Sequence, residues 1–410
     1  MADLPDPHAR RNFVVNAIEG AFYISGAAFT SVQTVLPALV IRLGGGNVAV
    51  GAVSVIAWVG VFLPQILAAR YTETLPWKKP WAVWVGLIQR TTTFFIGLSI
   101  VLFGSSNPAV ALAFFLVLFS LSQTLLGVAT PGWFDLVAKL TPARRRGRLA
   151  GIRNSLGGVG GLLCGLMLTW FLGTFEFPTS YALAFFSAFV MQMVSIGVQW
   201  RLVEREPSKV VPRRSMVAYL RGQPHVFREN PEFKTFITAS AFQILASIPV
   251  GFFTAYAMSA FGARGSIIGE FTLTIVAIQV VSALVNGIIA DRYGNKVALV
   301  IAAIAMLCAS VWALVAPSLD WFRLVYMFLG ISLGTEILAR YNMAIEYGPV
   351  EQRSSYIGLT NTVLAPFYLS SLVGGWISDT FGYAAVFGVG VLFSLVAISL
   401  LISKVKDPRT

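Results

Sequence analysis

The chain has 410 residues, of which 56% are hydrophobic and only 12% are charged, whereas about a quarter of the residues of a soluble domain are charged. This composition excludes an ordinary soluble protein. The formal net charge of +12 would point to nucleic acid only if the basic residues gathered on one folded face; they lie between long apolar runs, so no nucleic-acid partner is expected.

The apolar runs are long enough to cross a membrane. A helix needs roughly 20 mostly apolar residues to span the hydrocarbon. Segments of this kind are predicted, in chain order, at residues 13–40, 48–69, 81–103, 109–137, 150–172, 181–202, 233–261, 266–290, 297–315, 321–345, 356–378 and 384–402. The first run is too long for the core of a signal peptide, so we predict an uncleaved first span.

The basic residues predict the orientation of these spans. Most of the 30 Lys and Arg residues lie before span one, after the even-numbered spans or in the centre of the chain. By the positive-inside rule these segments, and both termini, are expected in the cytoplasm.

The longest polar segment separates six spans from six. We predict an amino-terminal bundle at residues 1–202, a cytoplasmic linker at 203–232 and a carboxy-terminal bundle at 233–410. Residues 216–227 within the linker fit either a short helix on the membrane surface or a plain tether.

One short pattern occurs in both halves. Pro142, Arg146, Gly151 and Asn154 recur at the same spacing as Pro349, Arg353, Gly358 and Asn361. Each copy lies between apolar runs, which indicates an internally duplicated membrane protein, a common way of building transporters.

Twelve spans, two similar halves and a basic central loop together resemble the major facilitator superfamily over essentially the whole chain. The sharpest local match is Gly287, Asp291, Arg292 and Gly294 after span eight, which looks like that family's Gly-x-x-x-Asp-Arg-x-Gly loop. The resemblance implies an all-α membrane protein with two pseudo-symmetric six-helix bundles.

The resemblance also implies a latch in this loop. Gly287 is expected to allow close helix approach and Gly294 to turn the chain, while Asp291 would lie near the start of span five, beside Arg146 or Arg148. An ordinary capping aspartate is the alternative. Arg146 and Arg353 are expected to act as gate or lipid-headgroup residues. The equivalent loop after span two departs from the pattern, with Glu73 a weak substitute for the aspartate.

Ionisable residues inside spans cost roughly 2.5–3.5 kcal/mol on insertion scales, so each is a functional candidate. Those identified are Glu19, Arg90, Asp135, Glu336 and Arg340. Four of them lie on spans one, four and ten, which line the central cavity in the family that the chain resembles.

Three of these residues, Glu19, Glu336 and Asp135, are candidates for proton coupling. Glu336 and Arg340 can pair along their own helix, either as a static ion pair or as a proton carrier with an anion-binding partner. Glu19 has no basic partner in its own span and is expected to favour the neutral form, unless cytosolic water solvates it. Asp135 is a gate residue or the polar end of span four, and Arg90 is expected to neutralise a neighbour such as Asp135.

Polar stripes at helical spacing predict a water-accessible pocket. The candidates for contact with a solute are Tyr23, Gln33, Gln123, Trp133, Gln243, Arg340 and Asn361. Each has a structural alternative, because an amide or aromatic in a span often fills a helix contact.

These observations favour a secondary transporter that moves a small organic solute by alternating access, coupled to protons, with sodium coupling and uncoupled uniport as the open alternatives. A lipid or amphiphile flippase of the same fold is the alternative, followed by a receptor without transport. An enzyme ranks last, since only two His residues occur and no converging catalytic cluster is evident. We expect no metal or cofactor, membrane lipids as the only other partners, a monomer, and a bacterial inner membrane.

Overall fold

A computed structural model of the chain describes residues 7–208, 210, 230–348 and 353–408. The predicted surface segment 216–227 lies outside them. Within the described residues, 12 helical stretches are long and apolar enough to cross a membrane, from His8–Arg42 to Tyr383–Ser403. Every predicted span falls on one of these stretches, so the span prediction is confirmed.

The chain divides into two compact units. Unit 1 comprises Met1–Ser31 and Gly60–Arg213, and unit 2 comprises Val32–Val59 and Arg214–Thr410. Unit 2 thus takes in the end of the first span and the start of the second. The predicted bundle boundaries remain a prediction.

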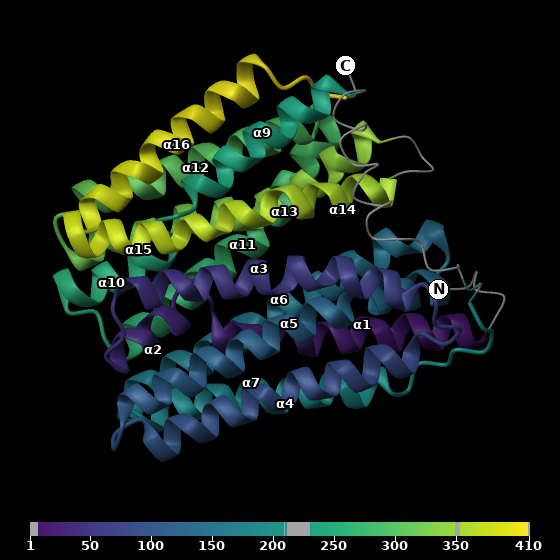
Figure 1. The fold of residues 1–410 in the computed structure, drawn as a ribbon, viewed down its shortest axis with the longest axis horizontal. Coiled ribbons are helices and arrows are strands. Elements are labelled where there is room, and N and C mark those ends of the chain that lie inside the picture. Colours follow the sequence, from purple (N-terminus) through teal and green to yellow (C-terminus); the bar gives the residue numbers. More distant parts are fainter. Residues whose placement is uncertain (1–6, 209, 211–229, 349–352, 409–410) are drawn as a thin grey trace. The chain divides into compact units, whose positions relative to one another are not determined.

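Unit 1 is built of long helices that run side by side (Figure 1). They are α1 (Pro7–Ala27), η1 (Ala28–Thr30), the second part of α3 (Asn47–Thr72), α4 (Lys79–Phe103), α5 (Pro108–Leu140), α6 (Ala143–Thr174) and α7 (Thr179–Gln199). Helix α1 packs against α6 and α7, and α4 packs against α5 and α7.

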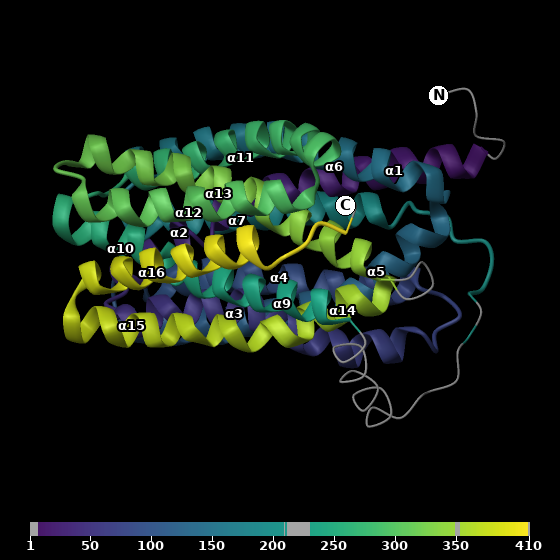
Figure 2. The same ribbon diagram turned by 90° about the horizontal axis from the view of Figure 1, so that it is seen from above.

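Unit 2 repeats this arrangement. It contains α2 (Val35–Arg42), the first part of α3, α9 (Pro231–Ala246), α10 (Val250–Phe261), α11 (Ser266–Tyr293), α12 (Asn295–Val315), α13 (Leu319–Tyr347), α14 (Arg353–Leu364), η3 (Ala365–Leu369), α15 (Ser370–Phe381) and α16 (Tyr383–Ser403). Helix α12 packs against α13 and α16, and α16 packs against α9 (Figure 2). These are the counterparts of the α4–α5, α4–α7 and α1–α7 contacts, as a duplication requires.

The first span is interrupted before α2, and a proline explains why. Pro37 has no N–H group, and its ring clashes with the carbonyl four residues earlier, so a helix cannot continue through both. That carbonyl belongs to Gln33, and it accepts a hydrogen bond of 3.0 Å from the Thr254 hydroxyl of unit 2. The interruption therefore leaves this backbone acceptor satisfied.

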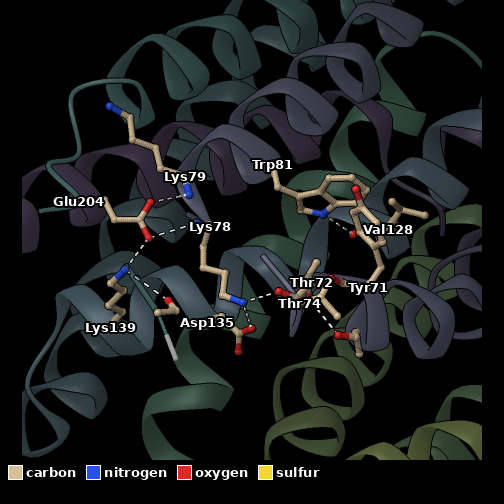
Figure 3. A network of polar contacts seen from close by, with 12 residues as sticks. Tyr71, Thr72, Thr74, Lys78, Lys79, Trp81, Val128, Asp135, Lys139 and Glu204 are labelled. Atoms are coloured by element: carbon tan, nitrogen blue, oxygen red, sulfur yellow. Dashed lines mark hydrogen bonds and ion pairs between the residues drawn. The ribbon is translucent and has the colours of Figure 1, made fainter. Parts of the chain in front are cut away.

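The start of the predicted linker is bound to unit 1. The Glu204 carboxylate accepts hydrogen bonds from the backbone N–H of Lys78 (3.1 Å) and Lys79 (2.9 Å), at the first turn of α4, and pairs with the Lys139 ammonium (2.8 Å) at the end of α5 (Figure 3). The Glu204 side chain is only 2% exposed. The carboxylate thus caps one helix, where unpaired N–H groups favour a negative charge, and fastens the chain to another.

Candidate functional site

Unit 1 contains a buried carboxylate that contacts three neighbouring helices. Glu19 of α1 is 2% exposed. Its Oε2 atom lies 2.7 Å from Nη1 of Arg153 on α6, and its Oε1 atom lies 3.7 Å from Nη2 of Arg90 on α4. Both arginine side chains are buried as well. One carboxylate therefore lies between two guanidinium groups from different helices.

Hydrogen bonds hold this arrangement together. Ser195 of α7 donates to Oε1 of Glu19 (3.1 Å), and Nη2 of Arg90 donates to the Ser195 hydroxyl (3.2 Å). Nη1 of Arg153 also donates to the backbone carbonyl of Asn16 (3.0 Å) and to its side-chain oxygen. Burying an ion costs several kcal/mol, and a pair offsets this cost only when its geometry is good and its remaining sites are bonded. Four helices meet these conditions around Glu19.

Two aromatic rings lie against the guanidinium groups. Arg90 lies 4.9 Å from the ring centre of Tyr23, and Arg153 lies 4.6 Å from that of Trp133. These distances are within the range of cation–π attraction, which strengthens where water is excluded. Both rings are half-buried. We call Glu19, Arg90, Arg153, Tyr23 and Trp133 the Glu19 centre.

The geometry corrects two expectations. Glu19 is neither unpaired nor solvated, because its partners come from other helices. Arg90 neutralises Glu19 rather than Asp135. Asp135 instead lies 3.8 Å from the Lys78 ammonium, with its side chain 47% exposed (Figure 3).

Arg153 was not predicted as a site residue. It lies inside the predicted span at residues 150–172, but it closely follows a run of arginines and was counted with these cytosolic charges. Helix α6 begins at Ala143 and carries Arg153 into the bundle. One feature of the sequence could have revealed it. Gly20 adjoins Glu19, and a Cβ atom at Gly20 would lie 2.3 Å from the guanidinium carbon of Arg153. A glycine beside a buried acid leaves room for a large cationic partner.

The predicted pair in unit 2 is present. Arg340 of α13 pairs with Glu336 one turn earlier, and both are buried. Nη1 of Arg340 lies 3.4 Å from the hydroxyl of Tyr368, whose ring stacks on that of Trp58 with centres 5.2 Å apart. The pair is therefore neutral, and both charges belong to one helix.

The other cavity candidates are dispersed. Gln243 donates to the backbone carbonyl of Leu299 on α12 (3.1 Å), so its amide joins two helices of unit 2. Gln123 and Asn361 are half-buried on α5 and α14. Of the seven predicted contact residues, the structure brings only Tyr23 and Trp133 to the Glu19 centre.

The predicted latch residues lie at the end of α11. Asp291 and Arg292 are exposed. Gly294 turns the chain as expected, with φ of +91° and the Asp407 carboxylate where a Cβ atom would stand. At Gly287, by contrast, no heavy atom of the described residues outside its own stretch of helix lies within 4 Å of the position of a Cβ atom, so the expected close helix approach is not found among them.

Arg146 and Arg353 are the arginines of the duplicated pattern. Arg146 donates to the carbonyls of Ala138 (2.6 Å) and Thr141 (3.2 Å), and so caps the end of α5. A basic side chain is favoured there because the last carbonyls of a helix are unpaired and carry partial negative charge. The side chain of Arg353 lies outside the described residues.

Solved transporter structures share this fold. The D-xylose–proton symporter matches with a TM-score of 0.71 at 14% identity, over 98% of this chain and 99% of that one. A POT family transporter in complex with 5-aminolevulinic acid gives 0.72 at 12% identity, over 96% and 95%. A bacterial homolog of the human lysosomal transporter Spinster gives 0.66 at 15% identity, over 97% of each chain. At these identities the likeness establishes the fold alone.

Sequence comparison supplies the family. No curated protein sequence matches the chain. The profile of the Major Facilitator Superfamily, however, matches residues 78–367 and 235–410, which is most of the chain. Together with the twelve apolar helices, this match identifies an integral, multi-pass membrane protein that belongs to the Major Facilitator Superfamily.

Proposed function

We propose that the protein is a secondary active transporter that moves a small organic solute by alternating access, driven by protons that bind to Glu19. The observation that supports this role is the buried carboxylate between two guanidinium groups. Arginine stays charged in proteins, so the charge of the Glu19 centre changes only when Glu19 gains or loses a proton.

Protonation of Glu19 has a direct structural consequence. The ionised carboxylate draws Arg90 from α4 and Arg153 from α6 toward α1. Once the Glu19 carboxyl is neutral, both ion pairs are lost. The two guanidinium groups then repel each other and can form hydrogen bonds with other acceptors. A proton thus alters contacts between three helices of one bundle, which is the kind of bistable element that coupling requires.

Glu336 is the second candidate for proton binding, and we assign it the lesser role. Its partner Arg340 lies on the same helix, so its protonation changes no ion pair between helices. We further propose that both termini are cytoplasmic and that the α11–α12 turn around Asp291 is a latch, as the basic residues and the loop pattern predict.

The test is a screen for solute-driven proton movement. The purified protein is placed in liposomes that contain a pH-sensitive dye, and sugars, amino acids, carboxylates, amines and amphiphiles are added in turn. We expect one class of solute to change the internal pH. The Glu19→Gln variant is expected to abolish this change, because an amide cannot carry the proton. A full proton response in that variant would refute the proposed role.

A further inference from the structure

The Glu19 centre has more positive than negative charge. Both arginines form their ion pairs with the same carboxylate. Tyr23 is a further titratable side chain beside Glu19, Arg90 and Arg153. Asp135 of α5 pairs with Lys78 instead. When protonation neutralises Glu19, the two buried guanidinium groups lose this partner, which is costly, so the protonated site favours an added anion.

Its unused hydrogen-bonding groups are donors. Nε of Arg90 and Nδ2 of Asn16 are buried and have no partner among the described residues. The Asn16 amide has a defined orientation, since its oxygen accepts from Arg153. Asn16 is 1% exposed and Arg90 is 6% exposed. Buried donors without acceptors are uncommon, and an anionic oxygen satisfies them.

We propose that the transported solute is an organic monoanion whose carboxylate binds Arg90 and Arg153 when Glu19 is protonated. This inference rests on the proposed function and adds the chemical class of the solute. A carboxylate matches the planar guanidinium group and replaces the one that protonation neutralises. The half-buried rings of Tyr23 and Trp133, which lie against the two guanidinium groups, provide apolar contact for the rest of the solute.

The charge of the centre supports a monoanion. With Glu19 ionised, two cations and one anion leave one net positive charge. With Glu19 protonated and a monocarboxylate bound, the net charge is the same. The empty and the loaded protein therefore experience the same electrostatic cost in the membrane, and one proton with one monocarboxylate moves no net charge. Transport should accordingly be insensitive to membrane potential.

Binding to the purified full-length protein tests this inference. Benzoate, phenylacetate, lactate and octanoate are compared with their uncharged amides, with inorganic phosphate and with phenethylamine, at pH 5.5 and 7.5. Binding is measured by calorimetry and by the shift in melting temperature, because a ligand that binds the folded state raises its stability. The variants are Glu19→Gln, Arg153→Gln and Arg153→Lys, with Arg323→Gln as control, since Arg323 belongs to a half-exposed pair with Glu270.

We expect at least one carboxylate to bind more tightly at the lower pH, and its amide not to bind. Arg153→Gln should weaken binding by about 10- to 100-fold, the loss of a charge-assisted hydrogen bond, and Arg153→Lys should restore part of it. Glu19→Gln should bind the carboxylate equally at both pH values. This tighter binding of Glu19→Gln at pH 7.5, relative to the wild type, can be measured even if Arg153→Gln fails to fold.

Several results would overturn the inference: no carboxylate in the panel binds, an amide or phosphate binds as well as the carboxylate, or Arg153→Gln and Arg323→Gln bind it alike. These failures are separable from failure of the proposed function. If a neutral or cationic solute drives proton movement that Glu19→Gln abolishes, proton coupling at Glu19 stands and only the class of solute is wrong.

Discussion

Replacing Glu204 by Gln tests how the start of the linker is fastened to the first bundle. The ionised carboxylate accepts from two backbone N–H groups of α4 and from Lys139. Glutamine keeps the shape and one oxygen, but its NH₂ group faces at least one of these donors and its charge is gone. A hydrogen bond to a charged group contributes about 1.5–3 kcal/mol.

The expected loss follows from this geometry. The Lys139 side chain is 20% exposed. Solvent therefore screens its ion pair with Glu204, and this pair contributes little to the free energy of unfolding. The two N–H groups at the start of α4 weigh more, because the Glu204 side chain is buried. We expect Glu204→Gln to lower the free energy of unfolding by about 2–4 kcal/mol, which lowers the melting temperature by at least about 4 °C in a unit of this size.

The assay is thermal unfolding of the detergent-purified protein followed by tryptophan fluorescence, at one fixed heating rate because such unfolding is often irreversible. Glu206→Gln is the matched control, since Glu206 is exposed and two positions away. If the two variants melt at the same temperature, the charge of the Glu204 carboxylate does not stabilise the start of α4.

Three further predictions concern packing, capping and coupling. Gly127→Ala should lower the free energy of unfolding by about 1–3 kcal/mol, because its Cβ atom would lie 2.3 Å from the Val61 carbonyl oxygen. Gly147→Ala should not, because a Cβ atom there would meet no atom of the described residues beyond its own helical turn within 4 Å; equal melting temperatures would contradict this. Arg146→Gln should cost about 0.5–1.5 kcal/mol through loss of its bonds to the end of α5, against no change in the exposed Arg144→Gln, as judged by chemical unfolding of both. Glu336→Gln should keep proton-driven transport in liposomes although it unpairs Arg340, and loss of proton dependence there, with Glu19→Gln unaffected, would transfer the coupling role to Glu336.

The sequence predicts the spans well because a membrane imposes a length and a composition on each of them. The pair of Glu336 with Arg340 was also predictable, since helical geometry brings positions four apart together. The interruption of the first span is different. Pro37 indicates the interruption. The Gln33 carbonyl that is left without a helical donor, however, accepts its hydrogen bond from Thr254, which lies far along the chain.

The Glu19 centre could be predicted only in part. A sequence can identify the polar and aromatic residues within spans, which include Glu19, Arg90, Tyr23 and Trp133. Their pairing depends on which faces of α1, α4 and α6 meet, and one sequence does not contain that information. Arg153 shows the same difficulty, because the arginines that precede it in the sequence, such as Arg146 and Arg148, are exposed, whereas its own contacts are Glu19 and Asn16.

Two activities of Glu19→Gln in liposomes, measured with whichever solute drives proton movement in the wild type, test most directly whether the driving proton binds to Glu19. We predict that the variant exchanges labelled solute for unlabelled solute across the membrane, because the permanently neutral side chain leaves Arg90 and Arg153 available. We also predict that an inward proton gradient no longer makes the variant accumulate solute. Accumulation equal to that of the wild type would show that the driving proton binds elsewhere and not to Glu19.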